Sequence, residues 1–154
     1  MMTSLIAQFA LAVFATLGFT IIFRVPVRDI PACIAIGGIG WITYLISIQY
    51  FLSPVFGCFI GACVVGLCST FAAHLLKDAT TIFIIPGILC LVPGAKIFYT
   101  MRELLSNDIS AAAETGLSTL LMAGAIAMGL LVMGAIINTI RAIVRKTVTI
   151  KDKI

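Results

Sequence analysis

The side chains with the clearest chemical potential follow two Pro-Gly pairs in one apolar stretch. Pro86-Gly87 and Pro93-Gly94 lie within residues 84–96, and the cation Lys96 and the phenol Tyr99 come directly after them. Each proline removes a backbone donor and each glycine loosens a turn, so both pairs are expected to break a membrane-crossing helix. A broken helix exposes N–H groups and a helix N-terminus that can bind the anionic group of a solute. The residues predicted to form or border such a solute site are Pro86, Gly87, Pro93, Gly94, Lys96 and Tyr99.

Lys96 and Tyr99 each have a simpler alternative role. An ammonium group near a broken helix can pair with a solute carboxylate, but Lys96 is also close enough to the end of the stretch to reach the membrane surface. The hydroxyl of Tyr99 can bind a solute, or its ring can belong to the aromatic belt of the interface. The whole stretch can equally be a kinked packing helix without a ligand.

The other reactive side chains do not form the active site of an enzyme. The five cysteines lie inside apolar runs and include no C-x-x-C pair, which predicts packing residues rather than disulfides, metal ligands or a redox pair. The sequence contains no H-E-x-x-H, G-x-S-x-G or phosphate-loop motif, and its six acidic residues are scattered at the ends of apolar runs. We expect no enzymatic activity, no metal and no cofactor.

The composition places these residues in a lipid bilayer. Hydrophobic residues make up 62% of the chain, charged residues 10%, and the mean hydropathy is +1.22. A soluble domain carries about 25% charged residues. The net charge of +4 comes from few basic residues, half of them in residues 141–154, and this placement does not indicate a nucleic-acid partner. We expect residues 1–154 to form a single all-α integral membrane domain.

Charge-free runs and prolines predict five membrane spans. Residues 30–76 carry no charge and would extend about 70 Å as one helix, too long for one crossing. Ser53-Pro54 is the expected break because proline disfavours helix in the residue before it. The first span is expected to stay uncleaved, since it lacks a basic n-region and is long for a signal peptide. The expected spans are residues 3–23, 31–51, 54–76, 81–101 and 114–140, with the fourth broken by the two Pro-Gly pairs.

The basic residues predict the orientation of these spans. With five crossings, Arg24, Arg28, Lys77 and the five basic residues of the tail share one side, while only Lys96 and Arg102 lie on the other. Four crossings would divide the basic residues equally. Basic residues concentrate in cytoplasmic loops, so we expect five crossings, an external N-terminus, and a basic cytoplasmic tail over residues 141–154 that contacts anionic headgroups.

Small residues and two polar pairs predict local contacts. Arg28 and Asp29 are expected to pair, and Asn107-Asp108 to form the N-cap of the last helix. Glycines and alanines in the spans allow helix backbones to approach closely, either within the chain or against a partner. They are Gly37, Gly38, Gly40, Gly57, Gly61, Gly66, Ala123, Gly124, Ala127, Gly129 and Gly134.

Three local matches show that the chain resembles the small subunit of the split threonine/serine exporter family of bacteria. They are Gly18–Phe23 with Val25-Pro26-Val27-Arg28; Gly37-Gly38-Ile39-Gly40-Trp41; and, most specific, Ile85-Pro86-Gly87, Leu91-Val92-Pro93-Gly94-Ala95, Tyr99-Thr100-Met101 and Asn107-Asp108. Length, span number and motif order agree over nearly the whole chain. Two departures are visible: Cys90 stands where relatives often carry proline, and Lys96 where a small residue is usual. The first makes the break less rigid, and the second adds a cation near it.

The resemblance implies a subunit of a secondary transporter in the bacterial inner membrane. Such a subunit would export threonine and serine, or a dicarboxylate such as succinate, driven by the proton gradient. It would assemble with a larger membrane subunit, and an odd number of spans suits an inverted repeat with a second unit. Two alternatives remain. One is a structural subunit that stabilises a larger partner without contacting the solute, and the other is a homo-oligomeric pore built through the glycine-rich faces.

Overall fold

The computed structural model describes the backbone of residues 2–151 and the side chains of residues 6–143. Within that range the chain is all-helical, as predicted, and no strand occurs. Side chains beyond residue 143, which include most of the predicted basic tail, lie outside the described residues. The helices are α1 (Met2–Ile22), α2 (Ile30–Phe51), α3 (Pro54–Leu76), α4 (Thr80–Leu89), α5 (Gly94–Leu105) and α6 (Ile109–Lys151).

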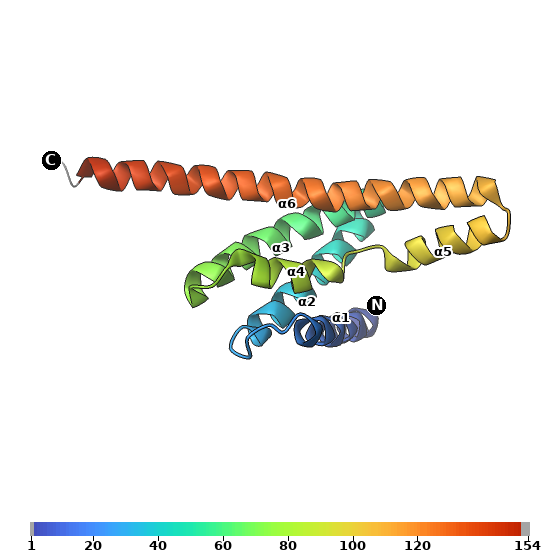
Figure 1. Ribbon diagram of the computed structural model, residues 1–154, viewed down its shortest axis with the longest axis horizontal. Helices are drawn as coiled ribbons and strands as arrows, with labels where there is room; N and C mark the ends of the chain where they lie inside the picture. The colour runs from blue at the N-terminus through green and yellow to red at the C-terminus, as the bar shows by residue number, and fades with distance from the viewer. Residues whose placement is uncertain (1, 152–154) are drawn as a thin grey trace.

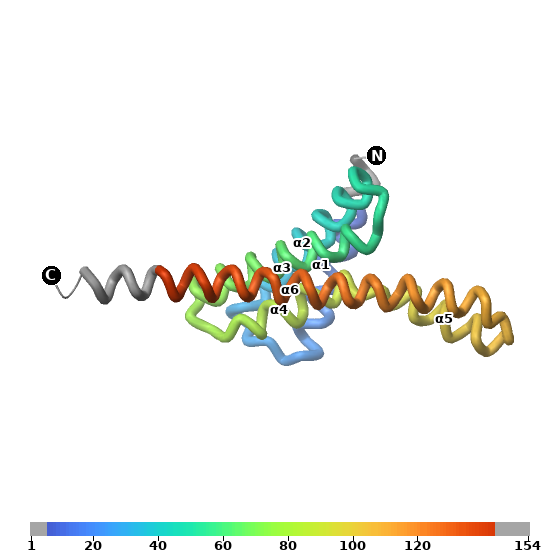
Figure 2. The backbone as a smooth tube through the Cα atoms, turned by 90° about the horizontal axis from the view of Figure 1, so that it is seen from above, coloured from blue at the N-terminus to red at the C-terminus, as the bar shows by residue number. Residues whose placement is uncertain are grey.

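The helices lie in a packed bundle from which one hairpin extends (Figure 1). α6 runs along one edge and α1 lies at the opposite edge, with α2, α3 and α4 between them. Viewed from above, α1, α2 and α3 slant relative to α6 (Figure 2). Among the described helices α5 packs only against α6. We call α5 and the adjoining first half of α6 the α5–α6 hairpin, which extends beyond the other helices in both views.

Proline and capping residues set the helix boundaries that the sequence predicts. Pro54 is the first residue of α3, and Ser53 caps this helix by accepting a hydrogen bond from the Phe56 N–H at 3.4 Å. At the other boundary, Asp108 caps α6: its Oδ1 accepts from the Ala111 N–H at 3.1 Å and from the Ser110 hydroxyl at 2.9 Å. These bonds, that of the Ala111 N–H foremost, hold the pKa of Asp108 below its usual value. The Ser53-Pro54 break and the Asp108 cap are both confirmed.

The lengths of the helices show which predicted spans are long enough to cross a membrane. α2, α3 and Ile109–Ile143 of α6 are long and apolar enough to cross a membrane, and α4 with α5 forms a fourth candidate bent by 52°. α2 and α3 match two predicted spans within a residue. The apolar part of α1 with described side chains, Ile6–Ile22, is shorter than the roughly 20 residues of a typical crossing. The span predicted over residues 114–140 is only the middle of α6, because helix ends in water accept charged residues.

A glycine brings α3 and α6 into backbone contact. A Cβ atom at Gly129 would lie 2.6 Å from the Phe59 carbonyl oxygen and 2.9 Å from the Ala62 Cβ. The Cys63 thiol also donates to the Gly129 carbonyl, with a sulfur–oxygen distance of 3.5 Å. The predicted close packing is therefore confirmed at Gly129. It is not found at Gly124 or Gly134, where a Cβ would meet nothing within 4 Å of the described protein.

We expect the Gly129→Ala substitution to destabilise the protein. The added methyl group would overlap the backbone of α3 and force the two helices apart, at a cost of about 1–3 kcal/mol. Gly134→Ala is the matched control in the same helix, and it should be neutral or stabilising by up to about 1 kcal/mol because alanine favours helix. Thermal unfolding of the purified variants in one detergent would test this, and equal stabilities of the two would contradict the α3–α6 contact.

Candidate functional site

The first Pro-Gly pair lies inside an unbroken helix. Pro86 and Gly87 are buried within α4, which continues to Leu89. Pro86 has no N–H to donate to the Ile82 carbonyl one turn earlier. The Cys33 thiol of α2 donates to that carbonyl instead, at 3.5 Å. The prediction that both pairs break the span is therefore wrong for the first pair, because a donor from another helix replaces the missing one.

The second pair forms the actual break. α4 ends at Leu89 and α5 begins at Gly94, with a bend of 52° between them. Leu91 inside the break is buried, and a Cβ at Gly61 of α3 would lie 3.1 Å from its side chain. Leu91 also contacts the position of Gly40 on α2. The break is thus held by glycines on two other helices.

The start of α5 offers backbone donors at the break. The Gly94 N–H donates to the Val92 carbonyl at 2.8 Å, and the Ile97 N–H to the Pro93 carbonyl at 3.1 Å. The amides of Ala95 and Lys96 lie between them in the first helical turn, where no preceding turn supplies acceptors. The positive end of a helix dipole is therefore located directly after the bend.

A cavity of about 400 Å³ lies beside the break, between α1 and α2. Two of its wall residues, Gln8 of α1 and Trp41 of α2, carry groups that can hydrogen-bond a polar solute. Cys90 of the break also forms part of the wall. Gln8 has no recognisable function in the sequence alone, because nothing there indicates that α1 packs beside the break. The wall residues are Gln8, Leu11, Ala12, Ala15, Trp41 and Cys90.

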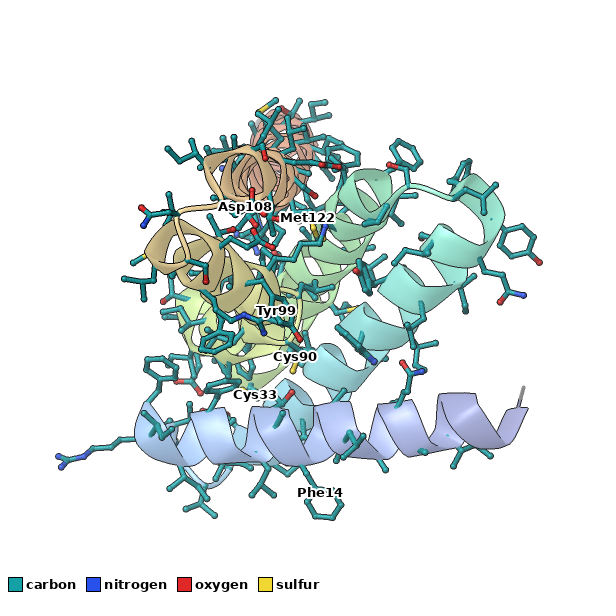
Figure 3. All side chains as sticks on the ribbon, turned by 90° about the vertical axis from the view of Figure 1, so that its right-hand side faces the viewer. Phe14, Cys33, Cys90, Tyr99, Asp108 and Met122 are labelled. Atoms are coloured by element: carbon teal, nitrogen blue, oxygen red, sulfur yellow. The ribbon has the colours of Figure 1, made fainter. Side chains whose placement is uncertain are left out.

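A buried hydroxyl ties Cys90 to α1. Thr16 is fully buried; its Oγ1 donates to the Ala12 carbonyl at 2.8 Å and lies 3.1 Å from the Cys90 sulfur. Figure 3 shows Cys90 on the side of α1 that faces the other helices, whereas Phe14 projects from the opposite side. Gly37 of α2 makes room for this contact, since a Cβ there would overlap the Thr16 hydroxyl. Cys90, singled out as a departure from the family pattern, is therefore part of a polar contact between the break and α1.

Lys96 and Tyr99 lie on the α5–α6 hairpin and do not line this cavity. The Lys96 ammonium donates to the Ser118 hydroxyl of α6 at 2.6 Å. Tyr99 is 48% exposed, and its ring centre lies 6.0 Å from the Arg102 guanidinium. The predicted site residues are thus found in three places: Pro86 and Gly87 in the core, Pro93 and Gly94 at the bend, and Lys96 and Tyr99 on the hairpin.

The arrangement suits binding of a small polar solute. The cavity walls are mainly apolar and uncharged, with an amide, an indole and a thiol among them. The donors at the start of α5 add a positive potential close to Cys90 in the chain. The described part of the chain contains no group of three or more His, Cys, Asp or Glu side chains able to hold a metal ion.

Comparison with known proteins adds two findings. The family model described as "Threonine/Serine exporter, ThrE" matches residues 8–136. An uncharacterized protein of Haemophilus influenzae is 22% identical over 104 residues, which cover 68% of this chain and 35% of that protein. The chain therefore spans about a third of the length of this relative. No solved structure matches the chain.

We expect the Gly37→Ala substitution to release Cys90 from Thr16. The new methyl group would displace the Thr16 hydroxyl, so Cys90 would lose the hydrogen bond that supports its reactive thiolate form and would react several-fold more slowly with a small maleimide. Gly18→Ala, in the same helix as Thr16 but with open space at its Cβ position, is the matched control. Peptide mass spectrometry would follow Cys90, with the fully buried Cys58 as an unreactive reference. Unchanged Cys90 labelling in Gly37→Ala would refute the contact.

Proposed function

The chain belongs to the threonine/serine exporter family, and from that premise we propose that it is one subunit of a secondary transporter that exports threonine or serine. The observation that carries this proposal is the cavity lined by Gln8, Trp41 and Cys90, because Cys90 belongs to the break that precedes the new helix α5. Discontinuous helices bind small solutes in many transporters because their ends provide unpaired backbone groups. As a member of a transporter family in the cell membrane, the chain is not expected to catalyse a reaction.

Each part of a small hydroxy amino acid has a possible partner at this site. Its carboxylate suits the amides of Ala95 and Lys96 at the positive end of α5. Its hydroxyl and ammonium groups can bond the amide of Gln8 or the sulfur of Cys90. In this proposal Pro93 and Gly94 shape the site, Pro86 and Gly87 hold α4 against the core, and Lys96 and Tyr99 border the site on the hairpin.

A dicarboxylate such as succinate is the second candidate solute. Lys96 is partly buried between α5 and α6 and is bonded only to a neutral hydroxyl, that of Ser118, among the described side chains. Such a cation could leave Ser118 and pair with a second carboxylate on the solute. Threonine would not need that charge, so transport of the two solutes should depend differently on Lys96.

Five crossings with an external N-terminus remain our proposed topology. Its support is Arg28, which joins the α1–α2 link to the α3–α4 turn. Its guanidinium donates to the Leu76 carbonyl at 2.8 Å and to the Asp78 carboxylate. Alternating crossings by α1, α2 and α3 would place these two connections on one side of the membrane. They also hold Arg24, Arg28 and Lys77, so the positive-inside rule assigns them to the cytoplasm.

A larger membrane subunit is the partner that we propose. The relative from Haemophilus influenzae is about three times as long as the matched region, so about two thirds of that protein lies outside the match. A separate subunit could supply the corresponding part, and the proton gradient would drive the complex. A subunit that only stabilises its partner and a homo-oligomeric pore are the alternatives.

We expect the tagged chain to copurify with one larger membrane protein at a fixed ratio. The measurement is a pull-down in mild detergent from membranes of cells that produce the chain naturally, followed by mass spectrometry. Recovery of the chain alone, at a multiple of 16.4 kDa, would contradict the two-subunit transporter and favour the homo-oligomeric pore.

We expect the Pro93→Ala substitution to reduce threonine efflux several-fold while the protein remains in the membrane. Alanine restores the missing N–H and allows helix to continue through residues 90–93, which would remove the donors at the start of α5. Pro54→Ala is the matched control, because a proline at the first position of α3 replaces no helical hydrogen bond. Efflux from threonine-loaded cells should be compared at equal expression. Normal efflux in Pro93→Ala would rule out the break as the site.

A further inference from the structure

Asp29 is a buried carboxylate that makes no hydrogen bond within the described protein. Its side chain is 0% exposed, and both carboxylate oxygens lack a hydrogen-bond donor among the described residues. It occupies the N-cap position of α2, yet it does not cap the helix. Its backbone is helical, with φ −96° and ψ −13°, rather than extended as in most caps. A charge buried in this way is costly unless it is paired or neutralised by a proton.

Among the described side chains, the charged one in contact with Asp29 is Arg28. The Arg28 Nε lies 3.5 Å from Asp29 Oδ1, which confirms the predicted pair, but the guanidinium also binds Asp78 more closely. The hydrogen bond and charge of Asp78, and then the charge of Asp29, raise the pKa of Arg28, which therefore stays protonated. Arg28 is 64% exposed and connects the buried Asp29 with the surface. Two carboxylates thus share one permanent cation.

The other elements around Asp29 contribute little charge. On α2 the titratable group that faces Asp29 is the buried thiol of Cys33, one turn further along. α1 and α4 carry no titratable side chain at all. The α3–α4 turn presents Asp78, which reaches Asp29 only through Arg28.

Arg28 and Cys33, the two residues that flank Asp29 in space, also bind the N-terminal part of α4 or the turn before it. Asp78 precedes the start of α4 at Thr80 and is bound by Arg28. Cys33 donates to the Ile82 carbonyl in the first part of the same helix. A shift of Arg28 between Asp29 and Asp78 would therefore act on the N-terminal end of the helix whose other end is the break.

We propose that Asp29 binds and releases the coupled proton, and that its occupancy is transmitted through Arg28 and Asp78 to α4. This inference rests on the proposed transport function. When Asp29 is ionised, it shares the Arg28 guanidinium with Asp78 of the α3–α4 turn. A proton taken from water forms an O–H bond on Asp29, the buried charge disappears, and Arg28 binds Asp78 alone. Release of the proton to water restores the first state.

A metal cation fits this position less well than a proton. Hard cations take about six or more oxygen ligands, whereas Asp29 offers two. The described residues hold no cluster of three or more metal-ligating side chains. A proton needs only one of the carboxylate oxygens, and it removes the cost of burying the charge.

The first test uses the chain with its copurifying subunit in proteoliposomes and radiolabelled threonine as the probe. For one proton per threonine, a gradient of one pH unit supports an accumulation of about tenfold in the wild type. With Asp29→Asn, the ratio of threonine concentrations across the vesicle membrane should stay at about one. This variant should still exchange labelled for unlabelled threonine when no pH gradient is present. Asp108→Asn, an exposed acid changed in the same way, should behave as the wild type. Accumulation by Asp29→Asn at the wild-type level, or accumulation driven by a sodium gradient, would overturn the proposal.

The second test detects the proton without transport. Infrared difference spectra between low and high pH should contain the C=O band of a protonated carboxyl group that Asp29→Asn lacks and Asp108→Asn retains. Asp29→Glu keeps a carboxyl group and should shift the frequency of this band. It can therefore identify the band if the asparagine variant does not fold. A wild-type spectrum without a band from residue 29 would overturn the inference even if threonine is transported. A band from Asp29 in a complex that moves no threonine would instead refute the proposed function.

Discussion

Close approach of three helices at glycines positions every other feature of the fold. Val65 of α3 contacts the positions of Gly40 on α2 and Gly87 on α4, so a Cβ atom at either glycine would crowd its side chain. Leu91 from the break fills the neighbouring space between Gly40 and Gly61. Apolar burial does not drive helices together within lipid, so such short-range packing must do so. The break, the cavity beside it and the start of α5 follow from this contact.

The few polar groups inside the bundle form hydrogen bonds at the places where a proline or the α4–α5 break interrupts the helical backbone. The Cys33 thiol replaces the donor that Pro86 lacks, and the Thr16 hydroxyl holds Cys90 at the bend. The Lys96 ammonium joins the two helices of the hairpin through Ser118. Each bond links segments that lie far apart in the chain. An unpaired polar group is costly in a membrane, so these bonds restrict α4 and α5 to a small number of arrangements.

The local signals in the sequence were sufficient to place α2 and α3 but not to predict the polar contacts between helices. Absence of charge and the Ser53-Pro54 boundary placed α2 and α3 within a residue, because these are local properties of the chain. The continuity of α4 through Pro86 could not be predicted, since it depends on a thiol from α2. The burial of Asp29 and the bond from Lys96 to Ser118 are tertiary contacts of the same kind. The resemblance identified the family, whereas the cavity wall at Gln8 required the packing of α1 to be known.

Helix α6 is long enough to connect the membrane-embedded bundle mechanically with the region outside the hydrocarbon core. Its 43 residues extend about 65 Å, roughly twice the thickness of the hydrocarbon core. The part of this rod that exceeds the hydrocarbon core must therefore lie among the lipid headgroups or in water. Because Gly129 locks α6 to the backbone of α3, the rod tilts whenever α3 tilts inside the bilayer. A small rotation near the bend would become a displacement of several ångströms at the far end of α6, where a protein in the aqueous phase could sense it or oppose it.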